Sequence, residues 1–321
     1  MNSWFYLVYA VLLVATFLIY FRLANRYSIV DLPNHRTMHE VATIRGGGIV
    51  ILLAVILFSI FFESPGYYFI SGMVILGIVG FLDDLVDLPG KVRFPIQVLS
   101  IVLILYELNL LELHFILLFV IIVLAVGTLN AFNFMDGING ITGGYGLVTI
   151  ISLLFVNNYI HNFIENDFLL FFILSLVVFN FYNFRNKAVC FAGDVGSLTV
   201  AYIIVYLIIK LVNETHQLVY LLFLTLYGID TIFTIIQRIL NKENIFEAHR
   251  LHLFQVAVHK TGMPQLRMSG IYMVVQAIIN ILVIWLILVN IKFQIIYSVV
   301  LLLTLSIFYV VVKRKMTQKS S

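Results

Sequence analysis

Long apolar runs separated by short polar segments make up most of the chain, and each run is continuous rather than alternating between apolar and polar positions. A helix needs about 20 apolar residues to cross a bilayer, within a range of roughly 17–25, whereas a barrel of strands would show alternation. The pattern therefore predicts an all-α, polytopic membrane bundle of about eleven transmembrane helices, with ten as the alternative. The expected spans lie near residues 3–23, 46–62, 67–82, 94–110, 113–132, 141–157, 168–184, 197–212, 217–238, 268–290 and 293–312.

Composition supports a membrane protein, because 62% of the 321 residues are hydrophobic and only 11% are charged. A soluble domain carries roughly a quarter charged residues. The first apolar run starts at Ser3, is too long for a signal-peptide core and lacks a preceding basic region, so we expect a retained helix. A single cysteine, Cys190, excludes an intramolecular disulfide. Residues 1–321 are expected to form one transmembrane domain.

The basic residues predict the orientation of the bundle. Of the 19 lysines and arginines, all but Lys210 and Lys292 fall in loops on one side of the eleven expected spans. Loops rich in Lys and Arg face the cytoplasm, so we expect the N-terminus outside and the C-terminus in the cytoplasm. The glycine-, aspartate- and histidine-rich clusters lie on the same side, in loops expected at 24-45, 83-93, 130-140, 185-196 and 239-267.

The first polar cluster is the pair Asp83 and Asp84, at the end of an expected span. Adjacent carboxylates repel each other and are costly to desolvate. A nearby cation would relieve both problems, and either Lys91 or a bound Mg²⁺ could supply it. A solvated acidic loop is the alternative interpretation.

The second cluster holds Asn130, Asn133 and Asp136. On a helix, the two asparagines share a face and Asp136 follows one turn later. All three carry oxygen atoms that suit a hard cation or its bound waters, and Gly137 and Gly140 allow a close backbone approach to a ligand. Polar helix ends that merely pack against neighbouring helices are the alternative.

The third cluster places Asp194 between Gly193 and Gly196, directly before an expected span. One carboxylate together with substrate phosphates is a common way to hold Mg²⁺. We expect Ser197 to be able to cap the following helix. Taken alone, such a segment is often only a turn.

The fourth cluster, in the longest loop of that side, contains His249, Arg250 and His252. The histidines would share a face if the segment were helical, and Arg250 could bind a phosphate through two hydrogen bonds. Zinc would need further ligands, which the sequence does not offer. Binding of a phosphate or nucleotide is favoured, with a structural histidine pair as the alternative.

In the first loop of that side, the glycines Gly46–Gly48 could form backbone nests for an anion, with Arg36 and Arg45 as counter-charges. The ordinary excess of basic residues in cytoplasmic loops explains the arginines equally well.

The order of the clusters is more distinctive than any one of them. From about Asp31 to Gln255, the chain resembles the polyprenyl-phosphate N-acetylhexosamine-1-phosphate transferases, which are relatives of phospho-N-acetylmuramoyl-pentapeptide transferase. The resemblance rests on motifs in this order: Asp83-Asp84 with Lys91, Asn130-x-x-Asn133-x-x-Asp136-Gly137, Gly193-Asp194-x-Gly196-Ser197, Asp230-Thr231 with Arg238, and the loop with His249 and His252.

The resemblance implies that an N-acetylated amino-sugar-1-phosphate passes from a UDP-sugar to undecaprenyl or another polyprenyl phosphate, with release of UMP, to start a cell-surface polysaccharide. It implies Mg²⁺, with Mn²⁺ as an alternative ion, and a bacterial inner membrane. No nucleic-acid partner is expected, and a homodimer is left open. Carried over by position, Asp194 is expected to bind the metal. The catalytic residues would be Asp83, Asp84 and Asp136, and the substrate-binding residues Asn130, Asn133, Lys91, His249, Arg250 and His252.

Two departures from the family pattern limit what is implied. The family often has a second acid where this chain has Asn139, so Asn139 is not expected to be catalytic. The loop around His252 reads His-Arg-x-His-x-Phe-Gln, which is closer to enzymes that start O-antigen or capsule chains. Neither departure identifies the amino sugar.

Two other functions are alternatives for a membrane protein of this kind. A transporter or flippase would place ionisable residues near the middle of the bilayer, where Asp230 is the main candidate. A CDP-alcohol phosphatidyltransferase is also membrane-bound and Mg²⁺-dependent, but its longer Asp-Gly…Ala-Arg…Gly…Asp…Asp pattern is not present in the sequence.

Overall fold

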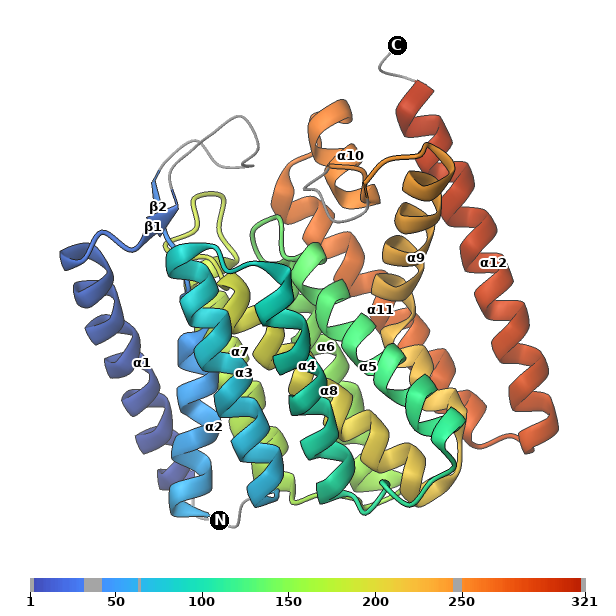
Figure 1. The fold of residues 1–321 in the computed structure, drawn as a ribbon, viewed down its shortest axis with the longest axis horizontal. Helices are drawn as coiled ribbons and strands as arrows, with labels where there is room; N and C mark the ends of the chain where they lie inside the picture. The colour runs from blue at the N-terminus through green and yellow to red at the C-terminus, as the bar shows by residue number, and fades with distance from the viewer. Residues whose placement is uncertain (1–2, 32–41, 63–64, 245–249, 319–321) are drawn as a thin grey trace.

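The computed structural model describes residues 3–31, 42–62, 65–244 and 250–318. Two residues singled out in the sequence, Arg36 and His249, lie outside these ranges. The helices run alongside one another in a bundle (Figure 1). They are α1 (Ser3–Arg26), α2 (Ile49–Phe61), α3 (Tyr67–Val86), α4 (Gly90–Glu107), α5 (Phe115–Met135), α6 (Ile141–Tyr159), α7 (Asn166–Asn183), α8 (Gly193–Thr215), the 3-10 helix η1 (Leu218–Leu224), α9 (Thr225–Leu240), α10 (Leu253–Thr261), α11 (Gln265–Ile287) and α12 (Ile291–Gln318).

The predicted fold class is confirmed, because every expected span coincides with a helix and η1 and α9 together form the ninth. In the part of the chain that the structure describes, nine helical segments are long and apolar enough to cross a membrane. The two that fall short are α2, with 13 residues, and α4, which carries Lys91, Arg93 and Glu107. The chain is therefore a multi-pass membrane protein.

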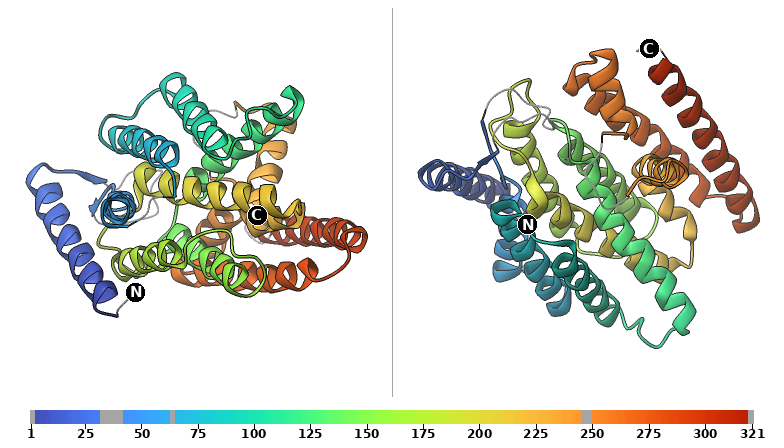
Figure 2. Two further views of the ribbon diagram at one scale, coloured as in Figure 1. Left: turned by 90° about the horizontal axis from the view of Figure 1, so that it is seen from below. Right: turned by 45° about the horizontal axis from the view of Figure 1, so that its top comes forward.

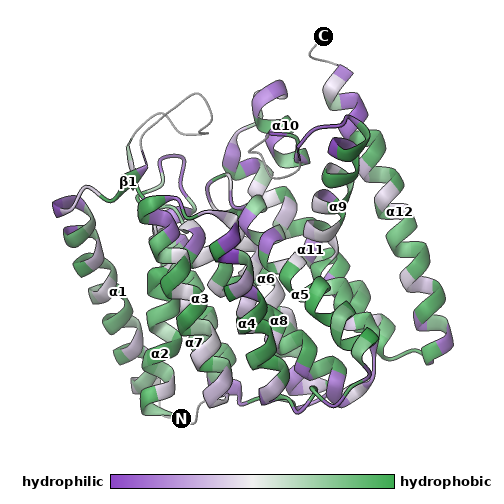
Figure 3. Cartoon of the chain, in the orientation of Figure 1, coloured by the Kyte–Doolittle hydropathy of each residue, from purple (hydrophilic) through white to green (hydrophobic). Residues whose placement is uncertain are grey.

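Hydrophilic residues gather at one end of the bundle, and the helices below are mainly apolar (Figure 3). This polar end carries α10 and a hairpin in which β1 (Val30–Asp31) pairs antiparallel with β2 (Thr43–Ile44). The C-terminal end of the chain lies on the same side, and the N-terminal end lies on the other (Figure 1). The polar end thus corresponds to the side where the sequence placed the chemistry.

The expected loops at 83-93 and 130-140 are helical in their first residues, because α3 continues to Val86 and α5 to Met135. Polar side chains at the end of a span reach the interface without interrupting the helix, so polarity alone does not mark where a helix stops. Asp87, in the left-handed conformation with φ of 49°, ends α3. Within 239-267 the structure also adds α10, whose nine residues are too few to show a helical period.

Helix α8 lies in the middle of the bundle, with the other helices around it and with α1 and α12 at opposite ends (Figure 2). It packs against α2, α3, α5 and α6, and 83% of its apolar span is buried. By contrast, only 6% of the α12 span is buried. The N-terminus of α8 is therefore the point around which the polar end of the bundle is arranged.

Glycines bring the backbones of α2 and α3 against the first turn of α8. A Cβ atom added at Gly48 would lie 2.2 Å from the Cα atom of Gly196, and one added at Gly80 would lie 2.9 Å from the Cα atom of Val195. No side chain fits at such distances. The close approach holds the ends of α2, α3 and α8 together at the polar end.

We predict that Gly48→Ala lowers the stability of the protein by about 1–3 kcal/mol, because a methyl group must push the backbones of α2 and α8 apart. Thermal unfolding in detergent measures the effect. The matched control is Gly127→Ala on α5, where an added Cβ atom meets nothing within 4 Å. Equal melting temperatures for the two variants would contradict the tight contact.

Candidate active site

The carboxylate of Asp84 caps the N-terminus of α8. Its Oδ1 accepts a hydrogen bond from the backbone N–H of Asp194 at 3.0 Å, and its Oδ2 accepts one from Val195 at 3.2 Å. Arg45 donates through Nε to Oδ1 at 3.0 Å. The first N–H groups of a helix lack intrahelical partners and carry a partial positive charge. The fully buried Asp84 side chain is therefore compensated by the helix and by Arg45.

This arrangement corrects one sequence expectation and explains a glycine. Ser197 does not cap the helix, because α8 already begins at Gly193 and the Ser197 hydroxyl donates to the Asp194 carbonyl at 3.4 Å. Gly193 itself is required for the cap, since it has φ of 70° and an added Cβ atom would lie 2.4 Å from Oδ2 of Asp84. A residue with a side chain at this position would displace the carboxylate.

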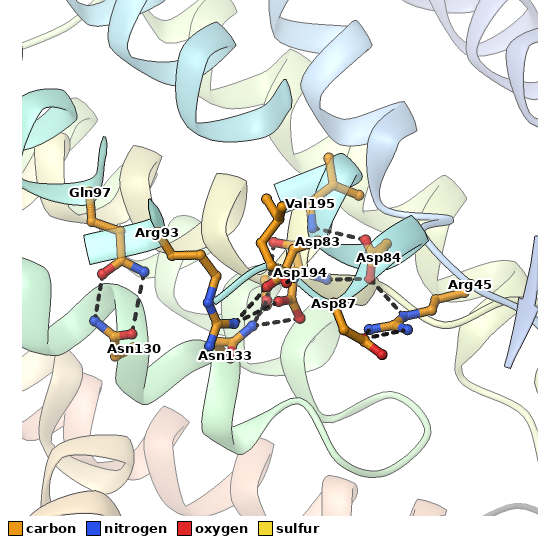
Figure 4. Close-up of polar contacts among 12 residues, drawn as sticks. Arg45, Asp83, Asp84, Asp87, Arg93, Gln97, Asn130, Asn133, Asp194 and Val195 are labelled. Carbon is orange, nitrogen blue, oxygen red and sulfur yellow. Dashed lines mark hydrogen bonds and ion pairs between the residues drawn. The ribbon is translucent and has the colours of Figure 1, made fainter. Parts of the chain in front are cut away.

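Asp83 and Asp194 share one arginine, Arg93 from the first turn of α4. Its Nη1 donates to Oδ2 of Asp83 at 2.6 Å and to Oδ2 of Asp194 at 3.3 Å (Figure 4). The backbone N–H of Leu88 donates to the other oxygen of Asp83 at 2.6 Å. One guanidinium therefore holds together two acids that are 111 positions apart in the sequence.

Asn133, near the end of α5, completes the cluster. Its Nδ2 donates to Oδ1 of Asp194 at 2.8 Å and contacts the Ser197 hydroxyl at 3.3 Å. The ends of α3, α4, α5 and α8 thus meet at one point with the loop that carries Arg45 (Figure 4). We call this group the acidic centre, which consists of Arg45, Asp83, Asp84, Arg93, Asn133 and Asp194.

Asn130 lies one turn earlier on α5 and has a different partner. It exchanges side-chain hydrogen bonds with Gln97 of α4, at 2.8 and 3.3 Å (Figure 4). Asn130 therefore joins α5 to α4 beside the acidic centre and makes no hydrogen bond to the acids in the described structure. Arg93 and Gln97 were missed in the sequence, although their spacing of four places both on one face of α4.

Asp136 directly follows the last residue of α5 and is close enough to Asp84 to be affected by its charge. Burial, opposed by contacts with Thr142 and with the backbone of Gly193, raises the pKa of its carboxyl group to about 7, and the charge of Asp84 adds to the rise. An acid with a pKa near neutral pH can exchange protons under ordinary conditions.

Lys91 does not supply the cation that the sequence suggested for the acidic pair. It is exposed, and in the described ranges it makes no hydrogen bond or ion pair. Arg93 and Arg45 neutralise Asp83 and Asp84 instead. Which basic residue pairs with the acids depends on the direction in which each side chain faces. The spacing in the sequence did not resolve that direction.

The glycines at 46–48 do not form an anion nest. The N–H groups of Gly47 and Gly48 donate to the carbonyls of Phe191 and Ala192, at 2.8 and 2.9 Å. These bonds attach the start of α2 to the segment before α8. Arg45 is engaged by Asp84 and, at 3.4 Å, by Asp87.

The histidine loop leads into α10. His252 is buried, stands directly before the helix and contacts Oδ1 of Asp230 through Nδ1 at 3.3 Å. It is therefore not on a helical face, and His249 falls outside the described residues. An added Cβ atom at Gly137 would meet the Phe254 ring at 3.0 Å. The start of α10 thus covers the turn that follows Asp136.

Arg250 precedes this start and is partly exposed. Burial and the charge of Arg250 lower the pKa of His259. The α10 region therefore brings positive charge to the same end of the bundle as the acidic centre.

Asn139, the amide at the position of the family's second acid, has a structural role. Its Nδ2 donates to the carbonyls of Arg185 and Asn186, at 2.8 and 3.4 Å. A carboxylate has no proton for these bonds. The amide therefore attaches the turn after α5 to the loop after α7.

Asp83 and Asp194 carry the kind of oxygen atoms that Mg²⁺ takes as ligands from proteins. Both carboxylates face one position, which Arg93 now fills with positive charge. Mg²⁺ is commonly held by one or two carboxylates together with substrate phosphates. Among the described residues there is no group of three or more His, Cys, Asp or Glu side chains placed to hold a metal.

The chain is similar to known proteins over the segment that holds most of the acidic centre. Residues 67–212 match the family described as Glycosyl transferase family 4. The chain is 29% identical over 258 residues to a probable undecaprenyl-phosphate N-acetylglucosaminyl 1-phosphate transferase of Bacillus subtilis, which covers 72% of this chain and 70% of that protein. It is 25% identical over 249 residues to the undecaprenyl-phosphate alpha-N-acetylglucosaminyl 1-phosphate transferase of Thermotoga maritima, which covers 74% of this chain and 76% of that one.

A third relative is the phospho-N-acetylmuramoyl-pentapeptide-transferase of Dictyoglomus thermophilum, 29% identical over 211 residues that cover 60% of this chain and 66% of that protein. The family segment contains every residue of the acidic centre except Arg45. Residues 67–212, whose acids gather at the polar end of a helical membrane bundle, match glycosyl transferase family 4, and the relatives from three bacteria extend the similarity beyond this segment.

Proposed function

We propose that the protein transfers an N-acetylated amino-sugar-1-phosphate from a UDP-sugar to a polyprenyl phosphate, such as undecaprenyl phosphate, and releases UMP. The observation that carries the proposal is the convergence of Asp83, Asp194, Asn133 and Arg93 at the polar end of the bundle. At that end a lipid headgroup and a soluble nucleotide can meet. The names of the relatives from Bacillus subtilis and Thermotoga maritima support this substrate class.

The reaction exchanges one P–O bond for another. An oxygen of the lipid phosphate attacks the phosphorus that carries the sugar, and the bond from this phosphorus to the UMP oxygen breaks. The second pKa of a phosphate monoester is about 6, so near neutral pH most of the acceptor is already a dianion. A strong base is therefore not required, and the protein mainly aligns two polyanions and neutralises them.

The acidic centre provides for this neutralisation. Asp194, with Asp83, would hold Mg²⁺, which supplies positive charge to the phosphates when bound. Arg93 is within reach of both acids and of any phosphate beside them. Asp84 acts as a positioning residue in this proposal, because its oxygens are occupied by α8 and Arg45.

Asp136 is placed to accept the remaining proton of an acceptor that arrives as a monoanion. Its pKa of about 7 lies close to that of the lipid phosphate. Arg250, in the loop that leads to α10, would bind phosphate of the donor. His249 belongs to the same proposal by its place in the sequence, and His252 would hold the start of α10 in position.

In a cell, the reaction would start a surface polysaccharide at the cytoplasmic side of a bacterial inner membrane, with the N-terminus outside. A transporter is not favoured, because the acidic centre lies at one end of the bundle rather than near its middle (Figure 3). Asp230, the buried acid that such a function would need, is instead bound to His252 and to the start of α10.

We predict that Asp194→Asn lowers turnover by at least about 100-fold, because the variant loses the charge that holds the cation and the geometry that aligns the phosphates. The assay is UMP release by the membrane-bound enzyme with undecaprenyl phosphate and a panel of UDP-N-acetyl sugars, at a series of Mg²⁺ and Mn²⁺ concentrations. The matched control is Asp167→Asn, which lies at the opposite end of the bundle beside Tyr6. Normal turnover by Asp194→Asn at limiting Mg²⁺ would refute its metal role.

The second prediction concerns pH. An acid is protonated below its pKa, so the proton-accepting form of Asp136 is lost as the pH falls through about 7. The role of Asp136 is limited to the pH range in which part of the acceptor is a monoanion, near the second phosphate pKa of about 6. The kcat/KM of Asp136→Asn should therefore match that of the wild type above pH about 7 and fall below it between pH about 6 and 7. Identical pH profiles of kcat/KM for the two enzymes would remove Asp136 from proton transfer.

A further inference from the structure

The buried acid Asp230 joins four helices at the polar end. Its carboxylate accepts hydrogen bonds from the phenol of Tyr272 on α11 at 2.6 Å and from the phenol of Tyr309 on α12 at 2.8 Å. It also accepts one from the backbone N–H of Leu253, the first residue of α10, at 3.0 Å. With the His252 contact, one carboxylate from α9 therefore fixes the start of α10 against α11 and α12.

A lysine completes the arrangement without touching the acid. Lys313 donates from Nζ to the Tyr309 hydroxyl at 3.0 Å and to the Thr234 hydroxyl at 3.1 Å. These two hydroxyls in turn donate to Oδ1 of Asp230, at 2.8 and 3.3 Å. Lys313 and Asp230 are thus connected through two hydroxyl groups. The Asp230 cluster consists of Asp230, Thr234, His252, Tyr272, Tyr309 and Lys313, all of them buried.

The two α12 residues of this cluster are unusual for their helix because they are buried. Most of that helix is exposed along its apolar span, where 6% is buried, and the buried side chains near its C-terminal end are Tyr309 and Lys313. A buried lysine and a buried aspartate are costly unless both are compensated. Near its C-terminal end, the buried polar contacts of α12 are thus made at the level of α10, where they fix the segment after Arg250.

We propose that Tyr309 and Lys313 are positioning residues for the nucleotide-sugar donor, acting through Asp230 on the start of α10. The inference rests on the proposed function, in which Arg250, just before α10, binds the donor. The Asp230 carboxylate accepts the first N–H of α10, beside the capping box of His252 and Gln255. The start of α10 packs over Gly137, next to Asp136. Both residues of α12 lie outside the segment 67–212 that matches the family.

The test separates donor binding from the other steps of the reaction. Lys313→Met and Tyr309→Phe keep the size of each side chain and remove one polar group. We expect the KM for the UDP-sugar to rise about tenfold in Lys313→Met and about fivefold in Tyr309→Phe, the range set by the loss of one buried hydrogen bond. The KM for the lipid phosphate and kcat should stay within about twofold of the wild type.

The controls are Lys315→Met and Tyr297→Phe, which make the same chemical changes at exposed positions of the same helix. Neither should alter the KM for the donor. A second readout does not depend on activity: hydrogen exchange at the amides of Leu253 and Phe254 should be faster in both test variants. Should Lys313→Met fail to fold, the milder Tyr309→Phe and its exchange rates still decide the question.

The outcomes are distinguishable. No UMP release by the wild type with any UDP-sugar would overturn the proposed function, and the positioning role with it. Turnover by the wild type together with equal changes in both KM values, a change confined to kcat, or unchanged exchange at Leu253 would overturn the positioning role alone. A rise in the donor KM with faster exchange at α10 would support both.

Discussion

The structure depends on the way a buried carboxylate is compensated at the start of a buried helix. Asp84 has no access to water, and its two oxygens are satisfied by the first N–H groups of α8 and by Arg45. Without this cap, the positive end of a central helix and an unpaired acid would both be left inside a membrane protein. The cap also sets the position of Asp194, whose own backbone N–H is one of the two donors. The same contact that stabilises α8 therefore places the acid next to Asp83 and Arg93.

A second helix at the polar end also has an acid from another helix at its start. Asp230 of α9 accepts from the first N–H of α10, and its charge is balanced through hydroxyl groups by Lys313. Unlike α8, α10 also has a local capping box between His252 and Gln255, and Asp230 fixes this capped start against the other helices. Segments that are far apart in the sequence are thereby brought to one surface. The side chains that serve the proposed reaction lie on the helix ends and turns that these caps hold in place.

Much of the fold was predictable, because a lipid environment demands long apolar helices and the sequence shows them directly. The acids Asp83 and Asp194 were also predictable, since charged residues at the end of a span need a reason. Their cations were not. Arg93 was overlooked in favour of Lys91, because the difference lies in which way each residue faces on α4. The cap of α8 was assigned to Ser197, since a tertiary cap from Asp84 leaves no local signal in the sequence.

The burial of α8 also affects how the protein responds to its membrane. A bilayer that is thicker or thinner than the helices acts on surfaces that touch lipid, by tilting or shifting them. Helix α12 offers such a surface along most of its length, and α8 offers very little. Changes in lipid composition therefore reach Asp194 only after passing through the surrounding helices, whereas they act directly on the helix that contacts α10. Bilayer thickness therefore affects the geometry around α10 directly and the geometry of the acids only indirectly.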